Sequence, residues 1–263
     1  MGFNPYFYQI MKVTFLGTGT SQGIPVIACN CEVCQSIDLR DKRLRTSIMI
    51  SSENTNLVID TGPDFRQQML REKVKTLDGV VFTHEHKDHI AGMDDIRAFN
   101  YVHKKDMNIY ASADVQKALH REFHYVFANK KYPGVPRVKL HSINDDPFMV
   151  GDIELIPINV LHYMMPVKGF RINDFSYITD AKTIPEKEFE KLKGTKILVI
   201  NALRKTAHVS HFNLEEALQM IERIKPQKAY LTHLSHLMGL HSELEKELPE
   251  NVEIAVDGLT VEI

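Results

Sequence analysis

Short runs of apolar and β-branched residues recur along the whole chain, and each run has the length that strands usually have. Runs of this kind, bounded by polar or turn-forming residues, are typical of buried β-strands. We therefore expect strands at Lys12–Leu16, Ser47–Ile50, Asn56–Ile59, Gly79–Phe82, Asn108–Ala111, Glu154–Leu161, Phe175–Ile178, Lys196–Ile200, Ala229–Thr232 and Val252–Val256.

Helical patterns lie between several of these runs. Asn213 and Glu216 form a capping pair that opens a helix, which ends at Ile224 before Pro226. Further helices are expected at Asp64–Arg71, Ile90–Val102, Ala113–Val126 and Glu186–Lys193, and in a short segment capped by Ser242. Strands that are joined directly in some places and through helices in others predict an α/β protein, with two mixed sheets packed face to face and helices outside.

The length and composition predict one folded domain. The 263 residues, 43% of them hydrophobic, are enough to bury a substantial core. The segment Lys130–Arg137 is the expected exposed loop, and no linker is long enough to divide the chain. We expect a single domain over residues 1–263, with residues 1–10 as an N-terminal extension.

The formal net charge of −2 argues against a partner that binds mainly through a broad basic surface. Local patches at Lys104-Lys105 and Lys130–Lys139 leave a nucleic acid partner open, and a homodimer is also left open. The chain does not open with a basic segment and an apolar run, and no later stretch of about 18 apolar residues occurs. We expect a cytoplasmic protein with no membrane partner.

A cluster of metal-binding residue types directly follows the predicted strand Gly79–Phe82. In the stretch Thr83-His-Glu-His-Lys-Asp-His89, the alternating His84 and His86 can point into one cleft, and Asp88 and His89 begin the next turn. Four potential ligands within six residues favour a metal site over a solvated polar turn.

Three further residues of ligand type follow the ends of predicted strands: His162, Asp180 and His233. Each alone has an ordinary explanation, as a strand-edge residue, a turn cap and a half-buried histidine respectively. Together they favour a shared site, because all three fall just past a strand end.

This ordered set resembles the metallo-β-lactamase superfamily of binuclear metallohydrolases, from Met11 onward. The resemblance implies an αββα four-layer sandwich with the site at one edge of the two sheets. It implies that one metal ion is held by His84, His86 and His162, a second by Asp88, His89 and His233, and that Asp180 bridges them. It also implies that Asp60 orients a ligand from outside the metal shell, while a role in capping the Thr61-Gly62-Pro63 turn stays open.

The ligand set determines the expected chemistry. Two divalent ions about 3.5–4 Å apart can activate a shared water and clamp the oxygens of a phosphoryl or carbonyl group. Imidazole and carboxylate ligands suit Zn²⁺, Mn²⁺ or Fe²⁺. The superfamily's di-iron oxygen reductases usually carry Glu where this chain has His86, so the resemblance favours hydrolysis, with catalytic roles for Asp88 and Asp180.

The stretch Ala207–Asn213 precedes the capped helix, whose N-terminus would favour an anion such as phosphate. His211 is therefore a candidate general acid, and His208 is the alternative. It also stays open that both are loop histidines without a catalytic role. In the superfamily's phosphodiesterases a histidine before this helix has that role, and His211 matches it better than His208.

All three cysteines lie in Cys29-x-Cys31-x2-Cys34, one thiolate short of a closed tetrahedral zinc site. Buried apolar thiols are the alternative. The fourth ligand must be of another type, and His236 and His241 compete for the place. The cluster, together with Thr232-His-Leu-Ser-His236, resembles the branch that contains phosphoribosyl cyclic phosphodiesterase. That branch implies a structural zinc at Cys29, Cys31, Cys34 and His236, separate from the hydrolytic pair of ions.

The resulting hypothesis is a dinuclear metal-dependent hydrolase of phosphodiesters, with a small cyclic phosphodiester of ribose or a nucleotide as the expected substrate. In it a metal-activated hydroxide attacks phosphorus, and His211 protonates the leaving oxygen. Alternatives are a tRNA 3′-processing endoribonuclease, which the FLGTG stretch also resembles, and a thioester or lactone hydrolase. A non-catalytic zinc-bound biosynthetic accessory protein is the alternative of another class. The glycines Gly17, Gly19 and Gly23 are read as a tight turn near the cleft rather than a dinucleotide site.

Overall fold

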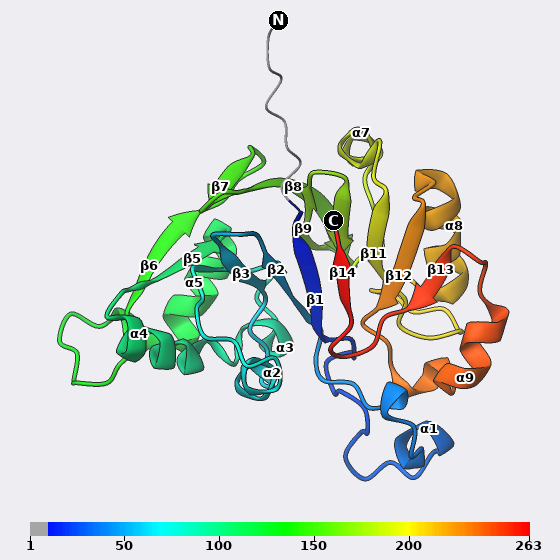
Figure 1. Ribbon diagram of the computed structural model, residues 1–263, viewed down its shortest axis with the longest axis horizontal. Coiled ribbons are helices and arrows are strands. Elements are labelled where there is room, and N and C mark those ends of the chain that lie inside the picture. The colour runs from blue at the N-terminus through cyan, green and yellow to red at the C-terminus, as the bar shows by residue number, and fades with distance from the viewer. Residues whose placement is uncertain (1–9) are drawn as a thin grey trace, which may run out of the picture.

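The computed structural model describes residues 10–263, so nearly all of the proposed extension at residues 1–10 lies outside the described part. Within it the strands form two seven-stranded sheets (Figure 1). In order across the first sheet the strands are β14 (Thr260–Glu262), β1 (Lys12–Gly17), β2 (Ser47–Ser51), β3 (Asn56–Ile59), β4 (Gly79–Val81), β5 (Met107–Ala111) and β6 (Val138–Ser142). Across the second they are β13 (Val252–Ile254), β12 (Lys228–Thr232), β11 (Ile197–Asn201), β10 (Phe175–Ile178), β9 (Met165–Ile172), β8 (Ile153–His162) and β7 (Phe148–Val150).

Both sheets are mixed, as the sequence predicts. In the first sheet β14, β1, β2 and β3 pair antiparallel, and β3 to β6 pair parallel. In the second, β7 to β10 pair antiparallel, and β10 to β13 pair parallel. Parallel strands end at the same edge of a sheet, so loops that follow them are brought together there.

The helices lie on the outer faces of the two sheets. Helices α2 (Phe65–Arg71), α4 (Arg97–His103) and α5 (Ala113–Glu122) accompany the first sheet, and α8 (Leu214–Ile224) covers the second (Figure 1). Shorter helices are α1 (Glu32–Gln35), α3 (Lys87–Ile90), α6 (His124–Phe127), α7 (Phe189–Leu192) and α9 (His241–Leu244). Single 3₁₀ turns are η1 (Leu39–Asp41), η2 (Met93–Ile96), η3 (Glu186–Glu188), η4 (His236–Met238) and η5 (Glu245–Glu247).

Alternation of side chains along the strands produces the four layers. Ile48 and Ile50 of β2 lie in the hydrophobic cluster between the sheets, which also takes Val199 of β11. The neighbours of Val199, Leu198 and Ile200, point the other way and pack under α8. Because successive strand residues face opposite sides, each sheet is covered on both faces. The predicted αββα sandwich is confirmed.

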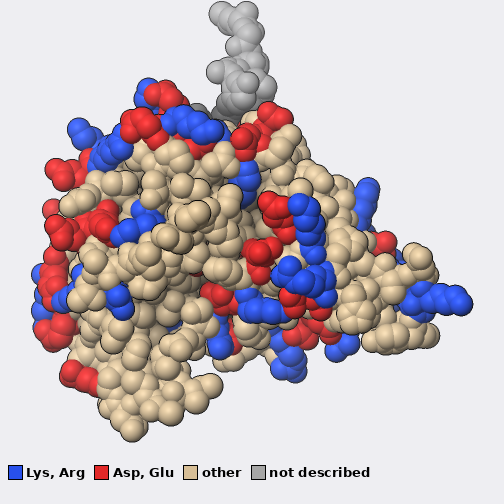
Figure 2. Space-filling view, turned by 180° about the vertical axis from the view of Figure 1, so that it is seen from behind, with Lys and Arg blue, Asp and Glu red and all other residues tan. Residues whose placement is uncertain are grey.

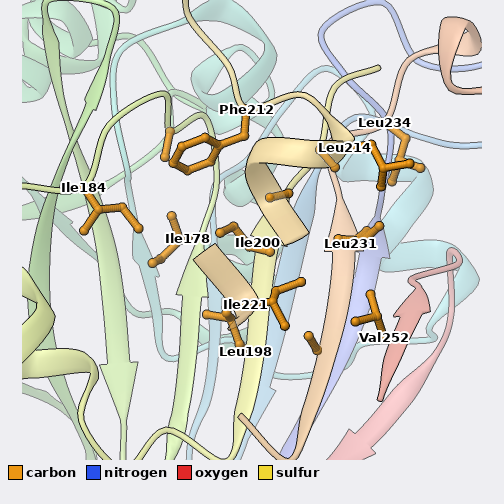
Figure 3. Close-up of a cluster of buried hydrophobic side chains, with 14 of the residues drawn as sticks. Ile178, Ile184, Leu198, Ile200, Phe212, Leu214, Ile221, Leu231, Leu234 and Val252 are labelled. Atoms are coloured by element: carbon orange, nitrogen blue, oxygen red, sulfur yellow. The ribbon is translucent and has the colours of Figure 1, made fainter. Parts of the chain in front are cut away.

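The outer cluster under α8 also holds two segments of the candidate site in place (Figure 3). Phe212, 4% exposed, and Leu234, 2% exposed, are part of this cluster. They are the chain neighbours of His211 and His233. Their burial therefore fixes the backbone beside two predicted functional histidines.

Four predicted helices differ from the structure. The helix expected at Ala113–Val126 is divided at Phe123 into α5 and α6, and the one expected at Glu186–Lys193 is the turn η3 followed by α7. The helix expected at Ile90–Val102 is broken into the end of α3, the turn η2 and α4. The break falls at Gly92, where a Cβ atom would lie 2.1 Å from the carbonyl oxygen of Gly62, so tertiary contact decides the backbone path. The last helix begins at His241 with Leu240 in the capping position, so the predicted cap at Ser242 is wrong.

Four strands escaped the sequence prediction: β6, β7, β9 and β14. Strand β9 contains Pro166, Lys168 and Gly169, which interrupt the apolar pattern that marks a strand. Strand β14 is short and largely exposed, so it has little apolar pattern to detect. The expected loop at Lys130–Arg137 is confirmed: it has no regular secondary structure and is mostly exposed.

Surface charge agrees with the near-neutral composition. On the face shown in Figure 2, basic and acidic side chains lie intermixed, with no broad area of a single sign. None of the helices within residues 10–263 combines the length and the apolar character needed to span a membrane.

Candidate metal centre

Three of the predicted site residues lie just past strand ends in the left-handed backbone conformation. Asp60 follows β3, Asp180 follows β10 and His233 follows β12, with φ of 67°, 56° and 57°. Non-glycine residues rarely adopt this conformation, which costs of order 1–3 kcal/mol and is concentrated at functional sites. The positive φ values thus fall at three residues whose side chains lie in one cluster.

The Asp180 carboxylate lies at the centre of the cluster. Its Oδ2 atom is 3.2 Å from His233 Nε2 and 3.8 Å from His84 Nε2, and its Oδ1 atom is 3.4 Å from His89 Nε2. Asp88 faces the same space, with Oδ2 3.2 Å from His89 Nε2 and 3.7 Å from His233 Nε2. Asp88, His89, Asp180 and His233 thus surround a volume that one metal ion can occupy.

A second group of imidazoles adjoins the first. The rings of His84 and His86 have centroids 4.7 Å apart, and those of His86 and His162 are 5.0 Å apart. The Nδ1 atom of His162 lies 3.1 Å from the backbone oxygen of Asp180, so its Nε2 atom is left for another partner. The structure therefore brings together all seven residues that the resemblance assigns to two metal positions.

The electrostatics of the cluster favour bound cations. Burial alone would lower the pKa of His89, but Asp180, Asp88 and Asp60 raise it well above the usual value. Burial would raise the pKa of Asp180, yet His233 and His89 hold it well below its usual range. The Nε2 atoms of His84, His89 and His233 are buried without a hydrogen bond. Unpaired imidazole nitrogens beside buried carboxylates fit divalent metal ions.

Asp60 contacts this centre through His89 and Thr83. Its Oδ2 atom accepts a hydrogen bond from His89 Nδ1 at 2.7 Å, as the prediction for this residue requires. The same oxygen accepts from the hydroxyl of Thr83 at 2.8 Å, and Oδ1 accepts from the Thr83 backbone N–H at 2.8 Å. The contacts of Thr83 were not predicted from the sequence, although its place directly before His84 was a usable signal.

The structure distinguishes the two histidines that precede α8. His211 is 8% exposed, and its Nδ1 atom is buried without a hydrogen bond, 4.0 Å from Asp180 Oδ2. Its ring lies between those of His162 and His233, at 4.4 Å and 4.8 Å. His208 is less buried, and its Nδ1 atom forms hydrogen bonds with the backbone N–H and the hydroxyl of Ser210. His211 is therefore the one that reaches the cluster.

Several N–H groups at the N-terminus of α8, where the sequence predicts an anion, have partners within the protein. Leu214 N–H donates to the Arg204 carbonyl oxygen, and the capping box joins Asn213 and Glu216 reciprocally. Ala217 N–H donates to the Asn213 carbonyl oxygen. With these donors occupied, the place of His211 rests on its own contacts rather than on free helix N–H groups.

The cysteines form a separate cluster with His236. The Nδ1 atom of His236 lies 3.3 Å from the sulfurs of Cys29 and Cys31, and 3.6 Å from that of Cys34. A tetrahedral zinc ion with usual bond lengths separates its sulfur and nitrogen ligands by about 3.6 Å. Burial would raise the pKa of Cys31, but the Cys34 backbone N–H and His236 lower it to about 6. Burial raises the pKa of Cys34 to about 11.

The competing ligand His241 has another role. Its Nδ1 atom lies 3.1 Å from the guanidinium of Arg43, and its backbone N–H donates to Asp41 Oδ1. It is absent from the group formed by the three cysteines and His236.

The glycine-rich stretch runs beside the metal centre, as predicted. Thr20 N–H donates to the carbonyl oxygen of Leu234, and Leu234 N–H donates to that of Thr18. Because Leu234 follows His233, these two bonds tie the loop to the strand end that carries a candidate ligand. At Gly17 a Cβ atom would lie 2.0 Å from the Arg45 carbonyl oxygen, so only glycine fits there.

Comparison with known proteins agrees with this geometry. Residues 55–234 match the family described as the beta-lactamase superfamily domain. The chain therefore belongs to the β-lactamase superfamily, and its four-layer architecture is the metallo-β-lactamase fold, which implies divalent metal ions. Within the superfamily it is PhnP-like. It is 35% identical to a protein whose crystal structure is described as a new diphosphatase from the PhnP family, with a TM-score of 0.91 over 97% of each chain.

Two curated relatives are named for different activities. The chain is 39% identical over 252 residues to octanoyltransferase of Porphyromonas gingivalis. The matched region covers 95% of this chain and 51% of that protein. It is 25% identical over 166 residues to ribonuclease Z of a Nostoc species, which covers 62% of this chain and 46% of that protein. The chain thus spans about half the length of these relatives.

Proposed function

We propose that the protein is a dinuclear metal-dependent hydrolase of phosphodiesters, with a small cyclic phosphodiester of ribose or a nucleotide as its substrate. The observation that carries the proposal is the position of Asp180, whose two oxygens lie within 3.2–3.8 Å of three imidazole nitrogens that have no hydrogen bond. A carboxylate shared in this way is suited to bridge two cations.

Each metal position has its own residues. His84, His86 and His162 would hold one ion, Asp88, His89 and His233 the other, and Asp180 would contact both. When bound, two divalent ions supply an activated water and stabilise negative charge on a phosphoryl group. The imidazole and carboxylate donors suit zinc, manganese or iron. Cys29, Cys31, Cys34 and His236 would hold a structural zinc outside the reaction site.

His211 would serve as the proton donor to the leaving oxygen. Burial and the neighbouring His233 lower its pKa to about 3, so the imidazole is neutral in the free site. A phosphate anion that enters the site favours the protonated form and is also the group that needs the proton. His208 would stand outside this step, because its ring is more exposed and does not reach Asp180.

The test combines metal analysis with a substrate panel. The purified protein is loaded with zinc or manganese and assayed with a chromogenic phosphodiester and with ribose and nucleotide cyclic phosphates. We expect three metal ions per chain and hydrolysis of the cyclic esters. A fully metallated protein that is inert towards all phosphodiesters would exclude this proposal.

Diphosphate hydrolysis is a second candidate, favoured by the relative described as a diphosphatase, which matches nearly the whole chain. It uses the same metal positions, with a phosphate rather than a ribose oxygen as the leaving group. A diphosphate-linked nucleotide belongs in the panel for this reason. An octanoyl thioester belongs there as well, because an acyl carbon can be attacked by the same activated water and one relative is named octanoyltransferase.

A further inference from the structure

Thr83 lies between the strand β4 and the histidine motif, and it is 1% exposed. Its hydroxyl oxygen is 2.8 Å from Asp60 Oδ2 and 2.9 Å from the Nδ1 atom of His84. Its backbone N–H is 2.8 Å from Asp60 Oδ1. The residue therefore contacts Asp60 twice and the candidate ligand His84 once.

The number of hydrogens fixes the direction of these bonds. A threonine hydroxyl has one proton, and the charged Asp60 oxygen is a better acceptor for it than a neutral ring nitrogen. The hydroxyl oxygen must then accept from His84, which places the imidazole proton on Nδ1. The Nε2 atom of His84 is left with a free electron pair, and this atom faces Asp180 Oδ2 at 3.8 Å.

Asp60 makes the same arrangement directly at His89. Its Oδ2 atom accepts from His89 Nδ1, so the Nε2 atom of that ring faces Asp88 and Asp180. We propose that Thr83 is a positioning residue, through which one buried carboxylate orients an imidazole at each of the two metal positions. His89 is held by Asp60 directly, and His84 is held through the Thr83 hydroxyl. The inference rests on the metal positions of the proposed function.

The test uses three variants that separate the hydroxyl from the side-chain volume. Thr83→Val keeps the shape and removes the hydroxyl, whereas Thr83→Ser keeps the hydroxyl. Thr195→Val is the matched control, because Thr195 is 4% exposed and its hydroxyl lies 2.8 Å from that of Ser176. Thr195 precedes β11, at the opposite end of the sheet from the metal centre.

Metal affinity is the readout, measured by titrating metal-free protein with Zn²⁺ in competition with a chromophoric chelator. Loss of an orienting partner usually lowers metal affinity about 10–100-fold. We expect that loss for one of the two active-site ions in Thr83→Val, about 3-fold or less in Thr83→Ser, and no change in Thr195→Val. Wild-type affinity for both ions in Thr83→Val, or equal losses in the valine and serine variants, would overturn the inference.

A second measurement needs no variant to fold. In ¹⁵N spectra of the metal-free wild-type protein, the His84 ring should carry its proton on Nδ1. A ring protonated on Nε2 alone would overturn the inference. Both readouts are independent of the reaction: inactivity of metallated wild-type protein counts against the proposed function only. Failure of the wild-type protein to bind two ions besides the structural zinc would overturn the metal positions and, with them, the role of Thr83.

Discussion

Removal of the His211 ring should slow hydrolysis most for substrates whose leaving groups need a proton. In His211→Ala the ring that lies 4.4 Å from His162 and 4.8 Å from His233 is lost, while the neighbouring Phe212 keeps the backbone anchored. A general acid contributes about 10²–10⁴-fold, or about 3–5 kcal/mol, when the leaving group is a strongly basic alkoxide. Nitrophenolate leaves readily without a proton, so its ester should lose less than about 10-fold.

In the proposed role of His211, the substrate itself would have to help to protonate this group. With the pKa of His211 lowered to about 3 by burial, protonation at pH 7 costs about 5 kcal/mol. An anion about 4 Å away at an effective dielectric constant of about 20 offsets about 4 kcal/mol of that cost. In the metal-free site, a bound phosphate group would therefore offset most of the cost of protonating His211.

The assay compares kcat/KM for a ribose cyclic phosphate and for a nitrophenyl phosphodiester, in wild-type protein and in His211→Ala. His208→Ala is the matched control, because it removes a neighbouring histidine that does not reach Asp180. Equal losses on both substrates in His211→Ala would refute the assignment of a proton donor. A larger loss in His208→Ala on the cyclic substrate would transfer the role to that residue.

Two further predictions concern the supports of the centre. Cys31→Ser removes one of the four residues of the cysteine cluster. Atomic absorption should therefore show one zinc ion fewer per chain, with the other two metal ions retained. Loss of all three ions from folded protein would show that the two sites are not separate. Asn213→Ala removes the capping box of α8 and should lower the free energy of unfolding in urea by about 1 kcal/mol, whereas Asn213→Asp should keep most of it; equal stability of the alanine variant would show that the cap is redundant.

The candidate ligands were predictable from the sequence because each follows a strand that has its own apolar pattern. Four of them share one short motif, and the other three occupy the same position relative to their strands. The resemblance then supplied the pairing of residues with metal positions, which spacing alone does not determine. The structure adds their convergence around Asp180.

The features that escaped prediction depend on contacts between distant segments. The N–H of Leu214 donates to the carbonyl oxygen of Arg204, and no sequence pattern near the helix indicates this hydrogen bond. The close approach of Gly92 to Gly62 breaks a helix whose apolar pattern is continuous in sequence. The role of Thr83 depends on Asp60, which lies 23 residues earlier in the chain.

The left-handed backbone at Asp60, Asp180 and His233 has a consequence for any variant made at these positions. Alanine there alters two properties at once, because it removes the side-chain chemistry and also prefers a different backbone conformation. Asparagine tolerates the left-handed conformation better than other non-glycine residues do, and it keeps a polar side chain of similar size to aspartate. Glycine and alanine both lose the side-chain chemistry and differ in how well they tolerate the left-handed backbone. The difference in abundance between these two variants therefore reports on the backbone, and the activity of an asparagine variant reports on the lost side-chain chemistry.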